Sequence, residues 1–216
     1  MLEYIRLDNS PILSQISNFK SAAILLHPFV QMPDGWEKSK RQRPFQHIYP
    51  SDEEIVTIGK PISWNQFSQQ SGLTLQEVGI AIHDHQNKRP DLTNQLLACF
   101  DCDFYYPRED KLSVFLLNDI LNVLGSKGAD FVFYSAPLEG EKGRLIIEEI
   151  KSVEVSDLSP AEIMLVDENL EFAFFSEYDA YTTMFLTNHD NIDEIIRRMN
   201  WEAIICDNNT TPTWFL

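Results

Sequence analysis

One stretch decides the fold: residues 162–207, EIMLVDENLEFAFFSEYDAYTTMFLTNHDNIDEIIRRMNWEAIICD. It holds apolar runs of four to six residues, the length of buried strands, at 163–166, 172–175, 181–186 and 203–206. Between the last two runs, residues 188–199 open with capping-type residues and acids and end in Arg197 and Arg198. This is the polarity that the helix dipole favours, so the stretch predicts a sheet with one helix on it.

The chain before residue 128 is predicted to be mainly helical. Ser51 and Glu54 have the spacing of a capping box, so a helix should run to Ile58. Further helices are expected to begin at Ser63, Thr74 and Asp91. The strongest covers 111–124, where one apolar stripe precedes Gly125.

Strands are also expected near the N-terminus and after residue 128. Residues 1–7 and 22–26 are apolar runs, and residues 130–135 and 144–150 flank a Gly-containing turn, as in an antiparallel hairpin. The sequence therefore predicts an α+β protein with a helical N-terminal half, 1–127, packed on a mixed, mainly antiparallel sheet formed by 128–216. No linker separates the halves, so we expect one domain over residues 1–216.

The net charge of −16 is unevenly distributed. Residues 1–100 carry nine Lys and Arg against ten Asp and Glu, whereas residues 101–216 carry eight against 23. Such a field repels nucleic-acid backbones and anionic membranes, and it favours cationic partners or simply solubility. The chief basic patch is residues 31–50, an expected surface loop that also holds Trp36, whereas Trp214 and Phe215 are expected to pack on the sheet.

Location is inferred from what the sequence lacks. Three cysteines are too few for a disulfide framework, and the N-terminus has no basic start followed by an apolar core. The apolar runs are far shorter than the ~20 residues of a membrane helix. We expect a protein of the reducing cytoplasm.

A metal site is the best chemical constellation in the sequence. His83 and His85 precede Cys99 and Cys102 by thirteen residues, and zinc favours imidazole and thiolate ligands together. The alternative is that Cys99 lies in the apolar face of a helix and that the histidines are surface residues. A redox dithiol at Cys99 and Cys102 is the weaker interpretation, because neighbouring aspartates oppose thiolate formation.

Other motifs do not name an enzyme. The Gly-rich stretches 125–128 and 140–143 lack the strand-to-helix context of a phosphate loop and are interpreted as turns. Glu148 with Glu149 and Glu177 with Asp179 are carboxylate pairs, but a chain with 33 acids contains such pairs by chance.

Several segments resemble a small bacterial family of uncharacterised proteins. They are residues 27–36, 48–55, 62–64, 201–207 and 212–214, and the resemblance extends over most of the chain. The resemblance implies a soluble cytoplasmic protein and brings no activity, cofactor or catalytic residue.

Two functional hypotheses follow, from different classes. The first is a non-enzymatic acidic protein that binds a protein partner with a basic face, and it involves no nucleic acid, membrane or cofactor. The second is a zinc-dependent enzyme or zinc-stabilised fold using His83, His85, Cys99 and Cys102, with Asp101 or Asp103 as the base. A small-molecule pocket between the helical half and the sheet is a third possibility.

Overall fold

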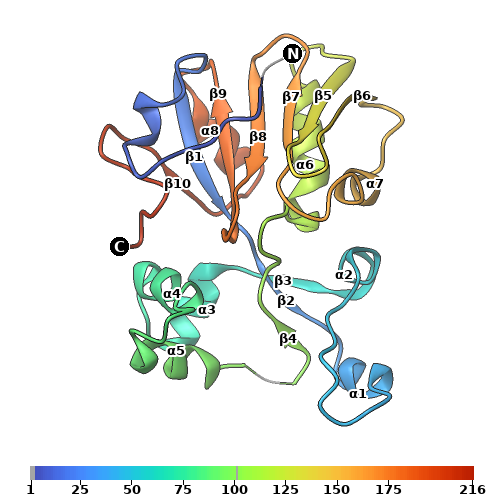
Figure 1. Ribbon diagram of the computed structural model, residues 1–216, viewed down its shortest axis with the longest axis vertical. Helices are drawn as coiled ribbons and strands as arrows, with labels where there is room; N and C mark the ends of the chain where they lie inside the picture. Colours follow the sequence, from blue (N-terminus) through green and yellow to red (C-terminus); the bar gives the residue numbers. More distant parts are fainter. Residues whose placement is uncertain (1–2, 101) are drawn as a thin grey trace. The chain divides into compact units, whose positions relative to one another are not determined.

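The computed structural model describes residues 3–100 and 102–216, which form two compact units (Figure 1). The sheet unit comprises the residues up to His27 together with Arg108–Trp214. The inserted unit comprises Pro28–Pro107 together with Phe215 and Leu216. In sequence, the second unit interrupts the first.

The sheet unit contains, in the described residues, one antiparallel sheet of seven strands in the order β10-β1-β9-β8-β7-β5-β6. Its strands are β1 (Ser21–Leu26), β5 (Phe131–Ala136), β6 (Glu141–Ile146), β7 (Met164–Asp167), β8 (Phe172–Ser176), β9 (Thr182–Thr187) and β10 (Ala203–Ile205). Its helices are η1 (Ile12–Ser14), α6 (Val114–Gly125), α7 (Ser152–Ser156) and α8 (Ile192–Arg198).

The first strand lies inside this sheet rather than at its edge. β1 pairs with β9 through Ser21 opposite Thr187, and with β10 through Ile24 opposite Ile204. Because β9 and β10 are both antiparallel to β1, they are parallel to each other, and α8 provides the crossover that parallel strands need.

Aromatic rings form the centre of the core. Phe174 of β8 stands opposite Phe185 of β9, and their rings stack 4.6 Å apart with 2° between their planes. Trp201 packs edge-on against both rings at 5.8 Å. Burying three such side chains removes several hundred Å² of apolar surface from water and ties β8, β9 and the segment after α8 together.

The inserted unit contains a small sheet in the order β3-β2-β4 with helices around it. The strands are β2 (Phe29–Gln31), β3 (Lys60–Ile62) and β4 (Phe104–Tyr105), and the helices are α1 (Trp36–Lys40), α2 (Asp52–Ile58), α3 (Trp64–Ser71), α4 (Leu75–Ile82) and α5 (Pro90–Leu97). Its core is aromatic: Phe29 stacks on Phe67 at 4.5 Å and tilts against Trp64 at 6.0 Å.

The predicted helix starts at Ser51, Ser63 and Thr74 are confirmed, whereas the expected surface loop 31–50 contains α1, in which Trp36 is buried. Ser51 and Glu54 form the predicted capping box, and Ser63 and Thr74 cap the next two helices with the same geometry. In each, the hydroxyl accepts the N3 backbone N–H, while the N3 side chain accepts the N–H of the cap residue.

The predicted division into a helical half, 1–127, and a sheet half, 128–216, is wrong, although the class remains α+β. Strands are interleaved with helices: β1 enters the large sheet, and β2, β3 and β4 form the small one. Both sheets are wholly antiparallel in the described residues, not mixed. The physical reason is that β1 is an apolar run buried on both faces. Such a segment is stabilised more by pairing with a strand on each side than by packing on the surface of a sheet.

Three local predictions are also corrected. Of the strand predicted over 1–7, residues 1 and 2 lie outside the described residues, and residues 3–7 form no strand. The second strand of the hairpin is Glu141–Ile146 rather than 144–150, because a turn at Gly140, with φ of 68°, pairs Ala136 with Glu141. The C-terminal residues form no strand, and Phe215 stacks on His83 of the inserted unit at 4.4 Å.

The aromatic core yields the first prediction. Phe174→Ala should lower the free energy of unfolding by about 3–5 kcal/mol, because a fully buried ring leaves a cavity between Phe185 and Trp201. Urea denaturation measures the change. Leu138→Ala, at a position 60% exposed, is the control and should be almost neutral. An equal effect of the two substitutions would contradict this account of the core.

Candidate functional site

Two glutamates face each other across neighbouring strands of the sheet unit. β7 and β8 pair with Met164 opposite Phe175, so continuing the register by two residues brings Glu162 opposite Glu177. The continuation is held by Ser176, whose N–H donates to the Ile163 carbonyl at 3.1 Å and whose hydroxyl accepts the Ile163 N–H at 3.1 Å. We call the sheet face that carries these two side chains and Met164 the carboxylate face.

The pair is electrostatically strained. Burial raises the pKa of Glu177 to about 7, and the charge of Glu162 adds to the increase, while a hydrogen bond from the Leu7 backbone opposes it. Glu162 is only 7% exposed and accepts the Tyr178 backbone N–H at 3.2 Å. Like charges directly opposite each other destabilise a sheet, so the fold tolerates a local penalty here.

The N-terminal segment closes one side of the pair. The Tyr4 ring packs edge-on against Phe175 at 6.0 Å, and its hydroxyl donates to the Ser176 carbonyl and lies 3.5 Å from Glu162 Oε1. Burial and the two glutamates raise the pKa of Tyr4, so this hydroxyl remains a donor at physiological pH.

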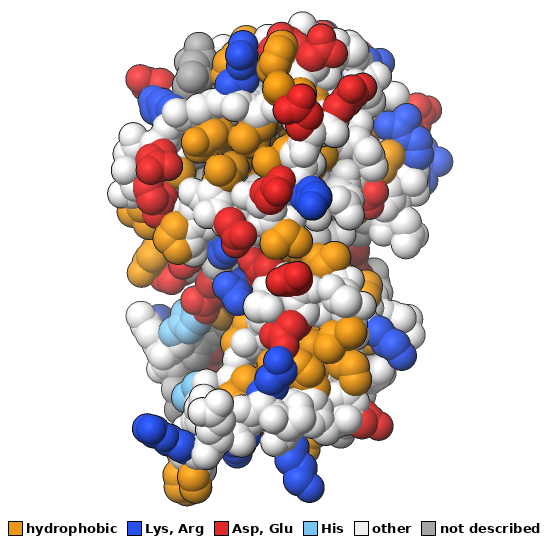
Figure 2. Space-filling model, turned by 90° about the vertical axis from the view of Figure 1, so that its right-hand side faces the viewer, with side chains coloured by type: hydrophobic (Ala, Val, Ile, Leu, Met, Phe, Trp, Pro, Cys, Tyr) orange, Lys and Arg blue, Asp and Glu red, His pale blue; other side chains and the backbone are white. Residues whose placement is uncertain are grey.

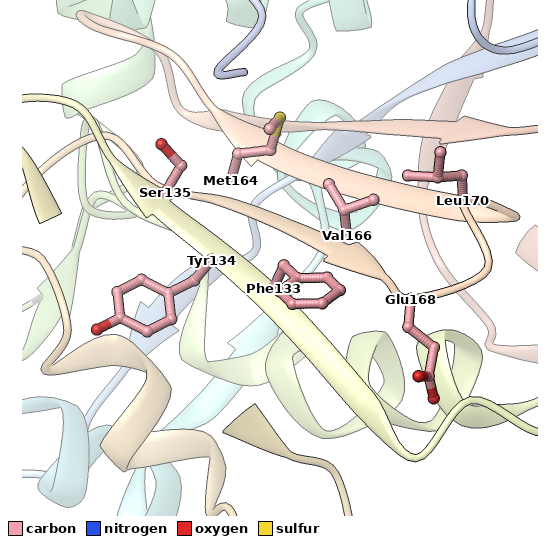
Figure 3. A pocket seen from close by; sticks show the side chains of 7 residues that line it. All are labelled: Phe133, Tyr134, Ser135, Met164, Val166, Glu168 and Leu170. Atoms are coloured by element: carbon pink, nitrogen blue, oxygen red, sulfur yellow. The ribbon is translucent and has the colours of Figure 1, made fainter. Parts of the chain in front are cut away.

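An apolar hollow of about 250 Å³ lies farther along the same face. Figure 3 looks onto it: Phe133 of β5 and Val166 of β7 lie side by side, Met164 and Ser135 follow in one direction, and Leu170 and Glu168 lie in the other. Glu162 lies two residues before Met164, the first residue of β7, where the register with β8 continues, so both side chains project from this face. The carboxylate pair therefore stands one side-chain spacing beyond the hollow.

Two further carboxylates lie on the loops beside the glutamate pair. Asp110 Oδ1 accepts the Asp179 backbone N–H at 2.6 Å. Burial raises the pKa of Asp110, and the charges of Glu109 and Asp179 contribute to the increase. Between Glu177 and Asp179, the Tyr178 side chain is 67% exposed.

The charge is concentrated in the unit that carries this face. The sheet unit has 23 Asp and Glu against ten Lys and Arg, whereas the inserted unit has ten against seven. Figure 2 shows the red carboxylate side chains spread over its view of the surface, rather than gathered into one patch. The carboxylate face is thus distinguished by its strained pair, not by the number of its acids.

The predicted zinc ligands have separate surroundings. His83 follows α4, where its Nδ1 lies 2.8 Å from the Gly79 carbonyl oxygen and its ring stacks on Phe215. His85 is exposed in the following turn, Cys99 Sγ lies 3.6 Å from the Gln95 carbonyl oxygen, and Cys102 is exposed. Among residues 3–100 and 102–216, no three His, Cys, Asp or Glu side chains are gathered where they could hold a metal ion.

The two proposed bases give no further support to a zinc site. Asp101 lies outside the described residues. Asp103 is 3% exposed, and its carboxylate accepts the backbone N–H groups of Gly35 at 2.7 Å and Glu37 at 2.5 Å. This carboxylate holds the start of α1 on the small sheet, so its role in the structure is to position the 31–50 segment. The zinc site itself stays a prediction.

The sequence interpretation missed the pairing of Glu162 with Glu177 and instead coupled Glu177 to Asp179. A usable signal was present: the apolar runs 163–166 and 172–175 are joined by a short polar segment, and each has a glutamate just beyond its outer end. An antiparallel hairpin with that register places the two glutamates opposite each other.

The fold and this face define an α+β protein with a largely buried carboxylate pair on a wholly antiparallel sheet. The chain belongs to the family described as protein of unknown function DUF2711, which it matches over residues 8–216. It is 39% identical over 224 residues to the uncharacterised protein YwbB of Bacillus subtilis strain 168, with 100% of each chain covered. These matches confirm the predicted resemblance to a bacterial family of uncharacterised proteins.

No solved structure matches the chain. Within the described residues, no helix has both the length and the apolar character needed to cross a membrane.

The raised pKa of Glu177 yields a pH-dependent prediction. The pKa of Glu177 is about 7 in the folded protein and 4.5 ordinarily, so the folded state binds this proton more tightly than the unfolded state. The resulting contribution to the free energy of unfolding is complete below about pH 4.5 and is lost as pH rises through about 7. Glu177→Gln removes this loss. The variant should melt a few degrees above the wild type at about pH 8 and at the same temperature near pH 4.

Differential scanning calorimetry across this pH range measures the effect. Glu149→Gln, an exposed position after β6, removes the same charge and should not reproduce the pH dependence. A Glu177→Gln variant that is less stable than the wild type at about pH 8 would contradict the strained pair.

The zinc hypothesis has a direct test. Because the described residues bring no three such ligands together, we expect no stoichiometric zinc in protein purified without a chelator or affinity tag. Cys102→Ser, at an exposed position, should leave the melting temperature unchanged. Mass spectrometry that finds about one zinc per chain, lost in Cys102→Ser, would instead establish the metal site.

Proposed function

We propose that this protein acts by binding a protein partner with a basic face, and that the carboxylate face of the sheet unit receives a basic side chain of that partner. The observation that carries the proposal is the pair formed by Glu162 and Glu177, in which burial and like charge raise the pKa of Glu177. A Lys or Arg placed between these carboxylates relieves their repulsion. The removal of this repulsion on binding contributes to the affinity for the partner.

The apolar hollow beside the pair supports a peptide segment rather than a lone cation. Met164, Val166 and Phe133 offer a surface that fits one apolar side chain. In an extended segment, side chains two residues apart point to the same side. A partner strand with an apolar residue and a lysine at that spacing would therefore occupy the hollow and reach the glutamates together.

The overall charge supports the same kind of partner. The excess of acids in the sheet unit attracts basic surfaces over distances of about a Debye length and speeds their association. This long-range attraction does not distinguish one basic partner from another. The specificity comes from the buried pair and the hollow.

Short synthetic peptides with an apolar residue two positions from a lysine test the proposal by fluorescence anisotropy. Binding should weaken as salt is added and should strengthen from about pH 6 to about pH 8, because Glu177 must lose its proton to hold the cation. The variant with both Glu162→Gln and Glu177→Gln should lose about tenfold or more in affinity.

Two controls separate this face from general acidity. Replacing the peptide lysine with glutamine should abolish the pH dependence. Changing Glu148 and Glu149 together to glutamine removes the same total charge elsewhere and should leave the affinity within about twofold at moderate salt. If both double variants weaken binding equally, the carboxylate face is not the binding site.

A further inference from the structure

The inserted unit contains a hollow of about 640 Å³ between the 41–49 segment and β4 with its flanking residues. This volume lies within the range of about 300–1,000 Å³ typical of small-molecule sites. It contributes nothing to the function proposed above, and all its lining residues belong to one unit.

Aromatic rings line this hollow and are held in place. Tyr105 packs edge-on against Tyr49 at 5.6 Å and against Trp36 at 5.7 Å. The Tyr49 hydroxyl donates to the Tyr106 carbonyl at 2.7 Å, which ties the 41–49 segment to the residues after β4. Phe104 adds a further ring, so the walls offer several π-faces to a flat ligand.

One ring on this hollow is presented to solvent. The Phe45 side chain is 97% exposed, and its backbone has φ of 61°, a left-handed conformation that a bulky residue rarely adopts. Exposing an entire phenyl ring forgoes its hydrophobic stabilisation, and an unusual backbone of this kind is common at ligand clamps. A ligand covering the hollow would bring this ring out of water.

The segment beside this hollow is basic. Arg41, His47 and the Glu37 carboxylate line the hollow, and residues 31–50 as a whole carry four Lys and Arg against two Asp and Glu. Arg41 pairs with Glu37, but its guanidinium has five donors, so it can hold this carboxylate and an anionic ligand together.

We propose that this hollow binds a nucleoside monophosphate. The base stacks on the aromatic walls with Phe45 closing over it, and the phosphate pairs with the Arg41 guanidinium. Stacking accepts any base, because every base has a π-face, and the arginine fork matches phosphate oxygens in pairs. Size, aromatic lining and basic rim thus favour one flat ring that carries one anionic group.

Isothermal titration calorimetry with AMP, GMP, CMP and UMP tests the proposal on the full chain. We expect one site per chain for at least one of them. Adenosine and inorganic phosphate, the two halves of AMP, should each bind about tenfold more weakly or not at all. No binding of any monophosphate at millimolar concentration overturns the proposal, and so does phosphate or the nucleoside binding as tightly as the whole nucleotide.

Matched variants locate the site. Phe45→Ala should weaken binding about tenfold without lowering the melting temperature, because the ring is exposed in the free protein. Leu97→Ala, at a position 46% exposed on α5, is its apolar control. Arg41→Gln should weaken the monophosphate about tenfold and leave the weak binding of the nucleoside unchanged, with Lys88→Gln as the charge control.

The outcome is independent of the carboxylate face. Changing Glu162 and Glu177 to glutamine should leave the monophosphate affinity unchanged, because those residues belong to the other unit. Full binding by Phe45→Ala and Arg41→Gln would place any observed nucleotide elsewhere and overturn the assignment of the hollow.

Discussion

The sheet unit depends on the two-sided pairing of β1. Its backbone donors and acceptors are satisfied by β9 on one side and by β10 on the other, strands that lie far along the chain. Five of its six residues are buried, so an unpaired edge would leave backbone N–H and C=O groups without hydrogen bonds and away from water. The chain can therefore complete this sheet only after its last strand is present, and the inserted unit must fold within the connection that follows β1.

The carboxylate pair is a consequence of the same kind of constraint. The apolar runs of β7 and β8 are buried over their full length, which fixes their register because a slip of one residue would turn buried side chains to the opposite face. This register places Glu162 opposite Glu177. Carboxylates with pKa values perturbed by burial and by a like charge cluster at functional sites.

The two units differ in how strongly they are charged and in where their charges lie. The sheet unit holds most of the excess negative charge, and the inserted unit holds an aromatic hollow with a basic segment, which the buried Asp103 carboxylate keeps in place. The segment beside that hollow is therefore basic, although the chain as a whole is acidic. Net charge alone predicts solubility and long-range attraction, but it does not locate a site.

By itself, the sequence determined the features that rest on neighbouring residues. The capped helices starting after Ser51, Ser63 and Thr74, and the buried strands between residues 163 and 186, follow from local hydrogen bonding and hydrophobic periodicity. Only the tertiary structure decided where β1 pairs, how Glu162 meets Glu177, and that His83 stacks on Phe215. The pairing of β1 and the stacking of His83 on Phe215 join residues that are distant in the chain, so no local signal selects these partners. The two glutamates are closer in the chain, but they meet only because burial fixes the register of β7 on β8.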